Sequence, residues 1–295
     1  MNKSASMGSL PAWILTGGLV CAFGLAGIGV LTMVERQRAA LVGAAELSYL
    51  PKGEYLKVAV LGYRQLAADL LWLKAIQLFG VRNQTTDGYL RAYHAVDVLT
   101  DLDPKFAYAY QVAGTILGVW AKQTRESIAI LTKGMRENPN VWQMPFFLGY
   151  DYYYELHDPA TAARFFRVAA TLPGSPAYLP KLAARMTVEA GDPEAALEFL
   201  QRFYQQVQDE RLREALAQRM KEVVVERDIR FLEEGVRRYQ KRFGKLPARL
   251  DDLVKHGIIV RIPEEPLGGS YKLRLPEGTV VGTGLRERLR VHRQQ

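Results

Sequence analysis

The chain has little of what most enzymes and disulfide-bonded proteins need. Its single cysteine, Cys21, rules out an intramolecular disulfide bond. Its histidines, His94, His157, His256 and His292, show no metal-like spacing with one another or with the cysteine. The sequence contains no Gly-x-Ser-x-Gly elbow, Walker loop or zincin motif. These absences predict a protein that is not an enzyme and that binds neither a metal ion nor a cofactor.

Acidic and basic residues give no stronger chemical signal. The carboxylates of Asp251-Asp252 and Glu264-Glu265 are neighbours in sequence, whereas catalytic carboxylates must face each other across a pocket. Lys and Arg number 39 against 31 Asp and Glu, a net charge of +8. The densest basic stretch, at 286–293, is short and is not interleaved with aromatic residues. We therefore expect no nucleic-acid partner.

A long uncharged run, residues 11–34, comes after a short N-terminal tail at 1–10. A helix of this length, rising about 1.5 Å per residue, crosses a hydrocarbon core of about 30 Å, and Trp13 falls where an interfacial aromatic would sit. A cleavable signal peptide is the alternative, but an Ala-x-Ala site before the next charged residues is missing. We expect a single-pass transmembrane helix, joined to a juxtamembrane linker at 35–57.

The charges that flank this segment do not orient it. Lys3 and the terminal amine lie on one side, and Arg36 and Arg38 lie on the other, so the positive-inside count is nearly even. We expect a bacterial inner membrane protein with its large domain outside the cytoplasm, because this is the common arrangement for a single early anchor.

The middle of the chain repeats at a nearly constant interval. Small residues recur at Ala92, Ser127, Ala162 and Ala196, at spacings of 35, 35 and 34 residues, and each is followed four places later by a large apolar residue. A period of this size is typical of stacked helix pairs, in which each pair buries its apolar face against the next. The sequence therefore predicts a helical repeat array over residues 58–207.

Turn residues divide this array and separate it from the C-terminal part of the chain. We expect one helix over about 58–82, a second over 89–100, and then helix pairs bounded by Gly, Pro and Asn. The pattern of residues 208–243 predicts a long charged helix with an apolar stripe, which would cap the array. Beyond it, residues 244–295 are rich in glycine, proline and β-forming residues and predict a small α+β appendage.

The repeat resembles the tetratricopeptide family, whose pattern of small, aromatic and turn residues spans about 34 residues of helix-turn-helix. The best copies are at 191–200, Gly-Asp-Pro-Glu-Ala-Ala-Leu-Glu-Phe-Leu, and at 158–169. The resemblance covers about residues 66–205 and implies a mostly α protein whose helix pairs form a right-handed superhelix. Gly114 and Gly149 each fall one place early for the family pattern. The number of repeats, three or four, therefore stays open.

In the tetratricopeptide family, the first helix of each pair lines a concave groove that binds peptides or protein segments. The resemblance therefore implies partner-binding residues on four first helices, with an aromatic middle and a basic end. They are Lys74, Gln77, Val112, Ile116, Trp120, Phe147, Asp151, Tyr154, Tyr178, Lys181 and Arg185. Ordinary packing between helices, or cover by the ends of the chain, is the open alternative.

A second resemblance lies in the C-terminal appendage. Gly244-x-x-Pro-x-x-Leu-x-x-Leu253, followed by Pro263-Glu-Glu-Pro-Leu-Gly-Gly-Ser-Tyr271, is similar to the C-terminal motif of type IV pilins and type II secretion pseudopilins. Glu265 stands where those proteins usually carry an aspartate, so the associated calcium site is not expected here. Turn prolines with a short helix and a small sheet would produce the same pattern, and a packing appendage stays the alternative.

These features favour a non-enzymatic scaffold that is tethered to the membrane through residues 11–34. The scaffold would bind a protein or peptide partner in the concave groove and so recruit or assemble an envelope complex. The alternative, suggested by the C-terminal motif, is a structural or assembly subunit of a type IV pilus or secretion machine. The sequence does not identify the partner.

Overall fold

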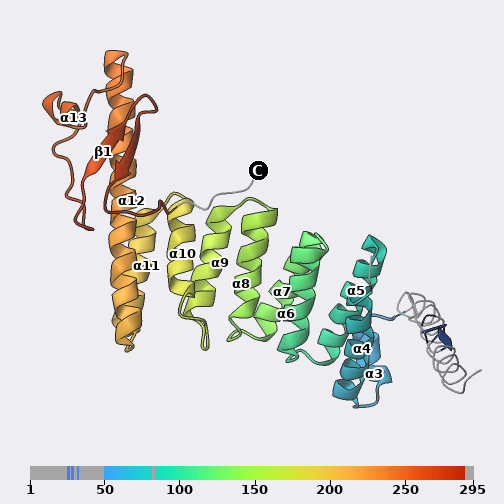
Figure 1. The fold of residues 1–295 in the computed structure, drawn as a ribbon. Helices are drawn as coiled ribbons and strands as arrows, with labels where there is room; N and C mark the ends of the chain where they lie inside the picture. The colour runs from blue at the N-terminus through green and yellow to red at the C-terminus, as the bar shows by residue number, and fades with distance from the viewer. Residues whose placement is uncertain (1–24, 27, 30–31, 33–49, 82–83, 290–295) are drawn as a thin grey trace, which may run out of the picture.

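The computed structural model describes residues 50–81 and 84–289, together with positions 25, 26, 28, 29 and 32. These residues form packed helices in sequential pairs, followed by a small two-stranded sheet (Figure 1). The prediction of a mostly α protein is confirmed. The predicted transmembrane segment 11–34 lies outside the described residues apart from the isolated positions.

The array begins with α3 (Gly53–Ala59), α4 (Arg64–Phe79) and α5 (Thr86–Leu102). The sequence predicts one helix over 58–82, but the chain turns at Leu61 and Gly62, whose φ angles are 46° and 94°. Left-handed backbone of this kind cannot continue a right-handed helix, so the predicted single helix becomes two. α3 also begins inside the stretch 35–57 that the sequence predicts as a linker.

Three further pairs come next, each made of a first and a second helix. They are α6 (Ala107–Thr115) with α7 (Thr124–Glu137), α8 (Gln143–Tyr150) with α9 (Pro159–Thr171), and α10 (Leu179–Glu189) with α11 (Pro193–Gln206). Asp158 and Asp192 cap the second helices α9 and α11, because each aspartate accepts a backbone N–H from the first turn at 3.0 and 2.9 Å. A proline in the first helical position suits the same geometry.

One turn of π-helix ends the first helix of two pairs. η1 (Ile116–Trp120) extends α6, and η2 (Asp151–Glu155) extends α8, whereas α10, every residue of which is described, contains no π turn. A π turn holds one residue more than the α turn that it replaces. Each 35-residue interval of the repeat contains one of these turns, and the 34-residue interval from Ala162 to Ala196 contains none. The π turns therefore account for the uneven spacing of the repeat.

The same extra residue explains why two glycines fall early for the family pattern. Gly149 precedes Ala162 by 13 residues across a π turn, whereas Ala184 precedes Ala196 by 12 residues without one. Two residues beyond each π turn, a non-glycine residue has the left-handed conformation: Lys122 at φ 56° and His157 at φ 55°.

The recurring small residues lie where helices approach closely. All four are fully buried: Ala92, Ser127, Ala162 and Ala196. A Cβ atom on Gly149 would come within 3.1 Å of the Phe166 ring, and one on Gly114 would overlap the Leu131 side chain. Small residues are thus needed on both helices of a pair, so that the larger apolar side chains can fill the space between them.

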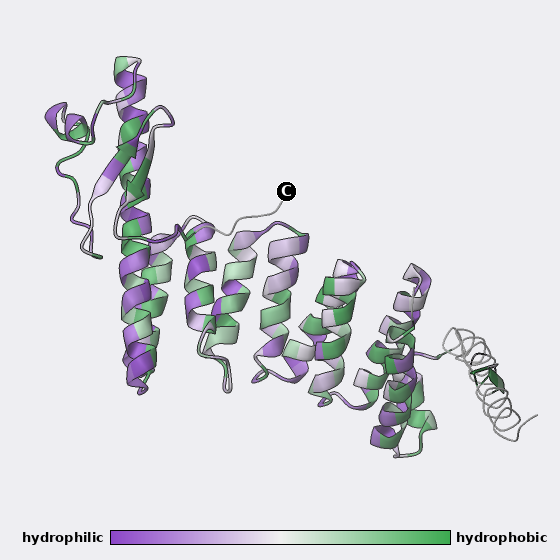
Figure 2. Ribbon diagram, viewed as in Figure 1, coloured by the Kyte–Doolittle hydropathy of each residue, from purple (hydrophilic) through white to green (hydrophobic). Residues whose placement is uncertain are grey.

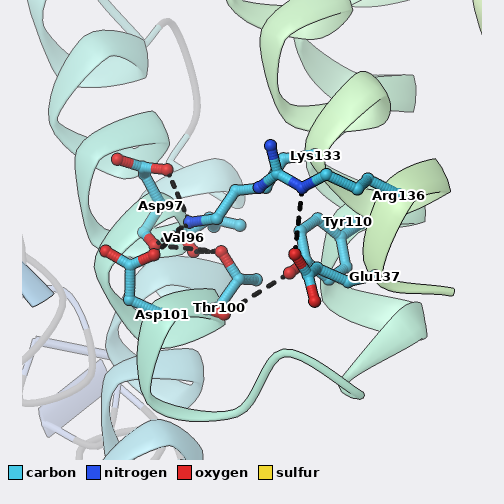
Figure 3. Close-up of polar contacts among 8 residues, drawn as sticks. All are labelled: Val96, Asp97, Thr100, Asp101, Tyr110, Lys133, Arg136 and Glu137. Atoms are coloured by element: carbon cyan, nitrogen blue, oxygen red, sulfur yellow. Dashed lines mark hydrogen bonds and ion pairs between the residues drawn. The ribbon is translucent and has the colours of Figure 1, made fainter. Parts of the chain in front are cut away.

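Ion pairs join the second helices of the first two pairs. Lys133 of α7 reaches across to α5, where its Nζ atom lies 2.8 Å from Asp97 Oδ1 and 2.8 Å from Asp101 Oδ1 (Figure 3). Beneath them, the Tyr110 hydroxyl donates a hydrogen bond to the Thr100 carbonyl at 3.4 Å. Burial raises the pKa of Tyr110 to about 12, so the hydroxyl stays protonated and able to donate. The interface between these two helix pairs is therefore polar at its edge and apolar in its interior.

The long helix α12 (Glu210–Phe243) covers the last pair and then extends beyond it (Figure 1). Its first half packs Leu216 and Val223 against apolar residues of α10 and α11. Its second half carries the short helix α13 (Asp251–Lys255) and the antiparallel strands β1 (Tyr271–Arg274) and β2 (Thr279–Gly282). The helix predicted over 208–243 and the predicted short helix and hairpin are thus all present.

Buried charges fasten the C-terminal unit to α12. The Arg288 guanidinium lies 2.7 Å from the fully buried carboxylate of Glu226 and 3.0 Å from Glu233. In the pilin-like stretch, both carboxylate oxygens of Glu265 lie 3.0 Å from the Gly284 N–H. One arginine of the predicted basic tail is therefore an internal ion-pair partner, and Glu265 receives a backbone hydrogen bond.

Candidate partner-binding site

The structure places the predicted partner-binding residues on the first helices, but only some face solvent. Lys74 and Gln77 are exposed on α4. Trp120, at the end of η1, is 73% exposed, and Tyr154 of η2 and Tyr178 at the start of α10 are about half exposed. Three large aromatic side chains on successive first helices are therefore available to a partner.

Other predicted residues lie between helices. Val112 is half-buried, and Ile116 and Phe147 pack against the apolar core that α4 to α8 share. Asp151 is buried, with 2% of its surface exposed. The surroundings of these residues therefore fit packing between helices, the alternative to the predicted groove.

Asp151 points into the joint between two pairs. It lies beside Gly118, where any Cβ atom would overlap its carboxylate, and it contacts the Ser127 hydroxyl. Ser127 is also within 2.9 Å of the Gly114 carbonyl, yet its hydroxyl has one hydrogen to donate. When Asp151 is ionised, the Ser127 hydroxyl donates to it; when Asp151 is protonated, it can donate to Ser127 and free that hydrogen for Gly114. Burial raises the pKa of the Asp151 carboxyl to about 6, which favours this protonated form.

The tyrosines of η2 face different sides. The Tyr153 hydroxyl donates to Glu189 of α10 at 2.6 Å, and the Tyr152 ring stacks on Phe165 of α9 with centroids 5.4 Å apart. Tyr154 is the exposed one. The run of tyrosines is therefore mainly a packing element, with one ring presented outward.

At the basic end of the predicted set, Arg185 lines an open cavity of about 430 Å³ between α10, α12 and residues 284–289. Arg219 of α12 and Arg286 also line this cavity, together with the carboxylates of Glu222 and Glu287. Arg219 Nη1 lies 2.9 Å from Glu222 Oε2, while its buried Nε has no hydrogen-bond partner among the described residues. Arg288, which is paired with Glu226 and Glu233, lines it as well, so the cavity gathers four guanidinium groups with two carboxylates.

Arg219 is a candidate site residue that the sequence did not reveal. It lies on the helix predicted as a charged cap, where one arginine cannot be told from the next. Its burial lowers the pKa of the guanidinium, and the positive charge of Arg185 acts in the same direction. An anion in the cavity would relieve this repulsion.

Among the described residues, no group of histidine, cysteine, aspartate or glutamate side chains is arranged to hold a metal ion. In the same part of the chain, no helix is both long and apolar enough to cross a membrane. No protein-family model matches the sequence, and no curated protein matches it either.

Proposed function

We propose that the chain is a membrane-tethered tetratricopeptide scaffold that binds a protein or peptide partner along its first helices. The sequential helix pairs support the family assignment, and so does the 34-residue interval of the pair without a π turn. A right-handed superhelix, a concave groove, an anchor at 11–34 and an extracytoplasmic array at the bacterial inner membrane belong to the same proposal. The proposed role is recruitment or assembly of an envelope complex, without enzymatic activity.

The observation that carries this proposal is the exposure of Trp120. A tryptophan that is 73% exposed on an inner helix of an array contributes nothing to the core of that array. Tryptophan and tyrosine supply much of the binding energy at protein interfaces, because their large rings desolvate fully in a partner's pocket. Tyr154, on the adjoining η2, adds a second exposed ring.

The arginine-lined cavity narrows the chemistry of the partner. Four arginines, Arg185, Arg219, Arg286 and Arg288, line the cavity against the two carboxylates of Glu222 and Glu287, so the lining favours an acidic residue of the partner. We therefore propose a partner segment with aromatic-binding pockets for Trp120 and an acidic residue for this cavity. Charge complementarity of this kind fixes the direction in which a segment binds.

Site-specific photocrosslinking in native membranes tests the proposal. A benzophenone amino acid replaces Trp120 in the full chain, and the control position is Thr132, which is exposed on the second helix α7. We expect one discrete crosslinked protein from position 120 and none from 132. The crosslink should weaken when Arg219→Gln is added, and it should persist with Arg202→Gln, an exposed arginine of α11. Equal crosslinking from both positions would refute the proposed face.

The second candidate function is a structural or assembly subunit of a type IV pilus or secretion machine. It is supported by the pilin-like stretch, because its short helix and hairpin pack together on α12 through Leu253 and Val280. Native purification separates the two functions. A stable complex of fixed stoichiometry favours the machine subunit, and a transient complex that depends on Trp120 favours the scaffold.

A further inference from the structure

At the amino-terminal end of the array, an apolar face of α4 is not covered by residues 50–81 or 84–289. Leu66, Leu70 and Leu73 are 56, 56 and 55% exposed, and their spacing places them on one side of α4. The other side of α4 buries Ala68 and Ala75 against the core that α4 shares with α5. α4 therefore has two apolar faces, and the described chain covers one of them.

Further large apolar side chains are exposed on α3, which packs on α5, and in the turn between α3 and α4. Large apolar side chains that are mostly exposed occur there at Tyr55, Val58, Leu61 and Tyr63. Together with Leu66, Leu70 and Leu73 we call them the α3–α4 apolar surface. Figure 2 shows hydrophobic and hydrophilic residues alternating along these two helices. Soluble monomers rarely expose this many large apolar side chains on neighbouring segments, so an occupant is expected.

The residues around this surface are mainly basic. Lys52, Lys57, Arg64 and Lys74 lie on the same helices or beside them, against two acidic residues, Glu54 and Asp69. Aliphatic side chains with tyrosines and a rim of lysine and arginine are the composition of protein surfaces that lie at the lipid headgroup boundary.

The place of this surface in the chain points the same way. The uncharged run 11–34 ends shortly before Gly53, the first residue of α3. Even fully extended, at about 3.5 Å per residue, the intervening 18 residues keep α3 within about 60 Å of the membrane. This step rests on the proposed anchor.

We propose that the α3–α4 apolar surface lies on the lipid bilayer, which takes the place of a preceding helix pair and so caps the amino-terminal end of the array. Leu66, Leu70 and Leu73 contact the acyl chains near the headgroups, and the basic rim contacts anionic lipid phosphates. The array then projects from the membrane with α3 and α4 at its base, which sets how far Trp120 stands from the bilayer.

A second copy of the chain is a poorer occupant. In a symmetric pair, each copy would bring its basic rim against the equivalent rim of the other copy. Like charges that meet at an interface oppose association, whereas anionic headgroups attract the same residues.

Depth-dependent fluorescence quenching tests this placement in the full chain. Cys21→Ala removes the native thiol, and Leu70→Cys carries an environment-sensitive NBD label in vesicles of phosphatidylcholine and phosphatidylglycerol. We expect blue-shifted emission that brominated acyl chains quench severalfold. A label at Val260→Cys, which replaces a 92% exposed residue of the C-terminal unit, should stay water-like and unquenched. Leu73→Cys is the second site, in case the first variant fails to fold.

Each other outcome has a defined meaning. Water-like emission at both α4 sites overturns the proposal. Blue-shifted emission without lipid quenching also overturns it, because protein then covers the surface; dependence on dilution identifies a second copy, and independence identifies the chain's own residues. Vesicle flotation separates the anchor from the surface. Protein that floats without quenching disproves this inference alone, whereas protein that does not float disproves the proposed tether.

Discussion

The two ends of the helical array are closed in different ways. At the carboxyl end, α12 places Leu216 and Val223 on the last pair and turns a polar side, with Arg211, Glu214 and Gln218, to solvent. At the amino end, α4 presents leucines where a preceding pair would pack. A repeat array needs a polar terminal element to stay soluble, and only the carboxyl end supplies one from the described chain.

This difference shows that the array is built to continue at one end and to stop at the other. The carboxyl end is completed by sequence: a long helix, a small sheet and the internal ion pairs of Arg288 with Glu226 and Glu233. The amino end follows the uncharged run 11–34 in sequence, and the proposed contact with the bilayer would complete it.

A matched pair of leucine substitutions tests this difference between the two ends most directly. Leu216→Ala removes a fully buried side chain at the carboxyl end and should lower the free energy of unfolding by about 2–5 kcal/mol. Leu70→Ala at the amino end should change it by less than about 0.5 kcal/mol in detergent micelles. Urea denaturation of the full chain, monitored by tryptophan fluorescence, measures both. Equal losses would show that α4 is covered in micelles as fully as α12 covers α11.

Substitutions at buried positions inside the array should destabilise the protein, as they should at the covered carboxyl end. Ala162→Trp introduces a large ring at a fully buried helix contact and should destabilise the protein by about 1–3 kcal/mol or more through overpacking. Ala129→Trp, at an exposed position of α7, is the matched control and should leave the melting temperature nearly unchanged. A wild-type melting temperature for Ala162→Trp would contradict the tight stacking of the pairs.

A buried acid should make the interior sensitive to pH. The pKa of Asp151 is about 6 when folded, against about 3.8 in the unfolded chain. The contribution of Asp151 to the free energy of unfolding is therefore greatest below pH 4. It falls as the pH rises to 6, because Asp151 loses its proton at lower pH in the unfolded chain than in the folded chain. The loss is on the order of 2 kcal/mol. Asp151→Asn should abolish this part of the pH dependence and be more stable than wild type at pH 7.

Urea titrations at several pH values measure the effect of Asp151→Asn. Asp192→Asn is the control, because Asp192 is an exposed helix cap. That variant should keep the wild-type change between pH 4 and 6. An unchanged pH profile for Asp151→Asn would mean that the Ser127 contact holds Asp151 ionised.

The smallest effect is expected where the π turns end. His157 adopts φ 55°, a conformation that costs a non-glycine residue about 1 kcal/mol, so His157→Gly should stabilise the protein by about 0.5 kcal/mol after the entropy cost of glycine. Gly191→Ala, at φ 101° in the pair without a π turn, should destabilise it. Thermal unfolding measures both. A loss of stability in His157→Gly would point to a contact of the imidazole.

Much of the fold can be predicted from the spacing of small residues. Ala92 and Ala162 predict stacked pairs because only small side chains allow helices to approach so closely. The break at Leu61 and Gly62 was missed, since an apolar run on both sides of a glycine has the same period as one continuous helix. In the sequence, each π turn corresponds to a repeat interval that is one residue longer, 35 instead of 34. The interval alone does not show which helix or turn contains the extra residue.

The candidate site was predictable in part. The repeat predicts the positions of three exposed aromatic residues, Trp120, Tyr154 and Tyr178, because it shows which side of each first helix faces outward. Asp151 shares that phase and is nevertheless buried, because Gly118 of the neighbouring pair makes room for its carboxylate. Packing between pairs, which sequence spacing does not encode, decides such cases.

The π turns have a consequence for how such an array can change over time. Inserting one amino acid into an α-helix rotates everything after it by about 100° and would ruin the stacking of later pairs. Here the extra residue of each π turn lies at the end of a first helix. The wider turn accommodates the extra residue, so that α7 and α9 still pack on their neighbours. The array can therefore vary the display of Trp120 and Tyr154 while its framework stays intact.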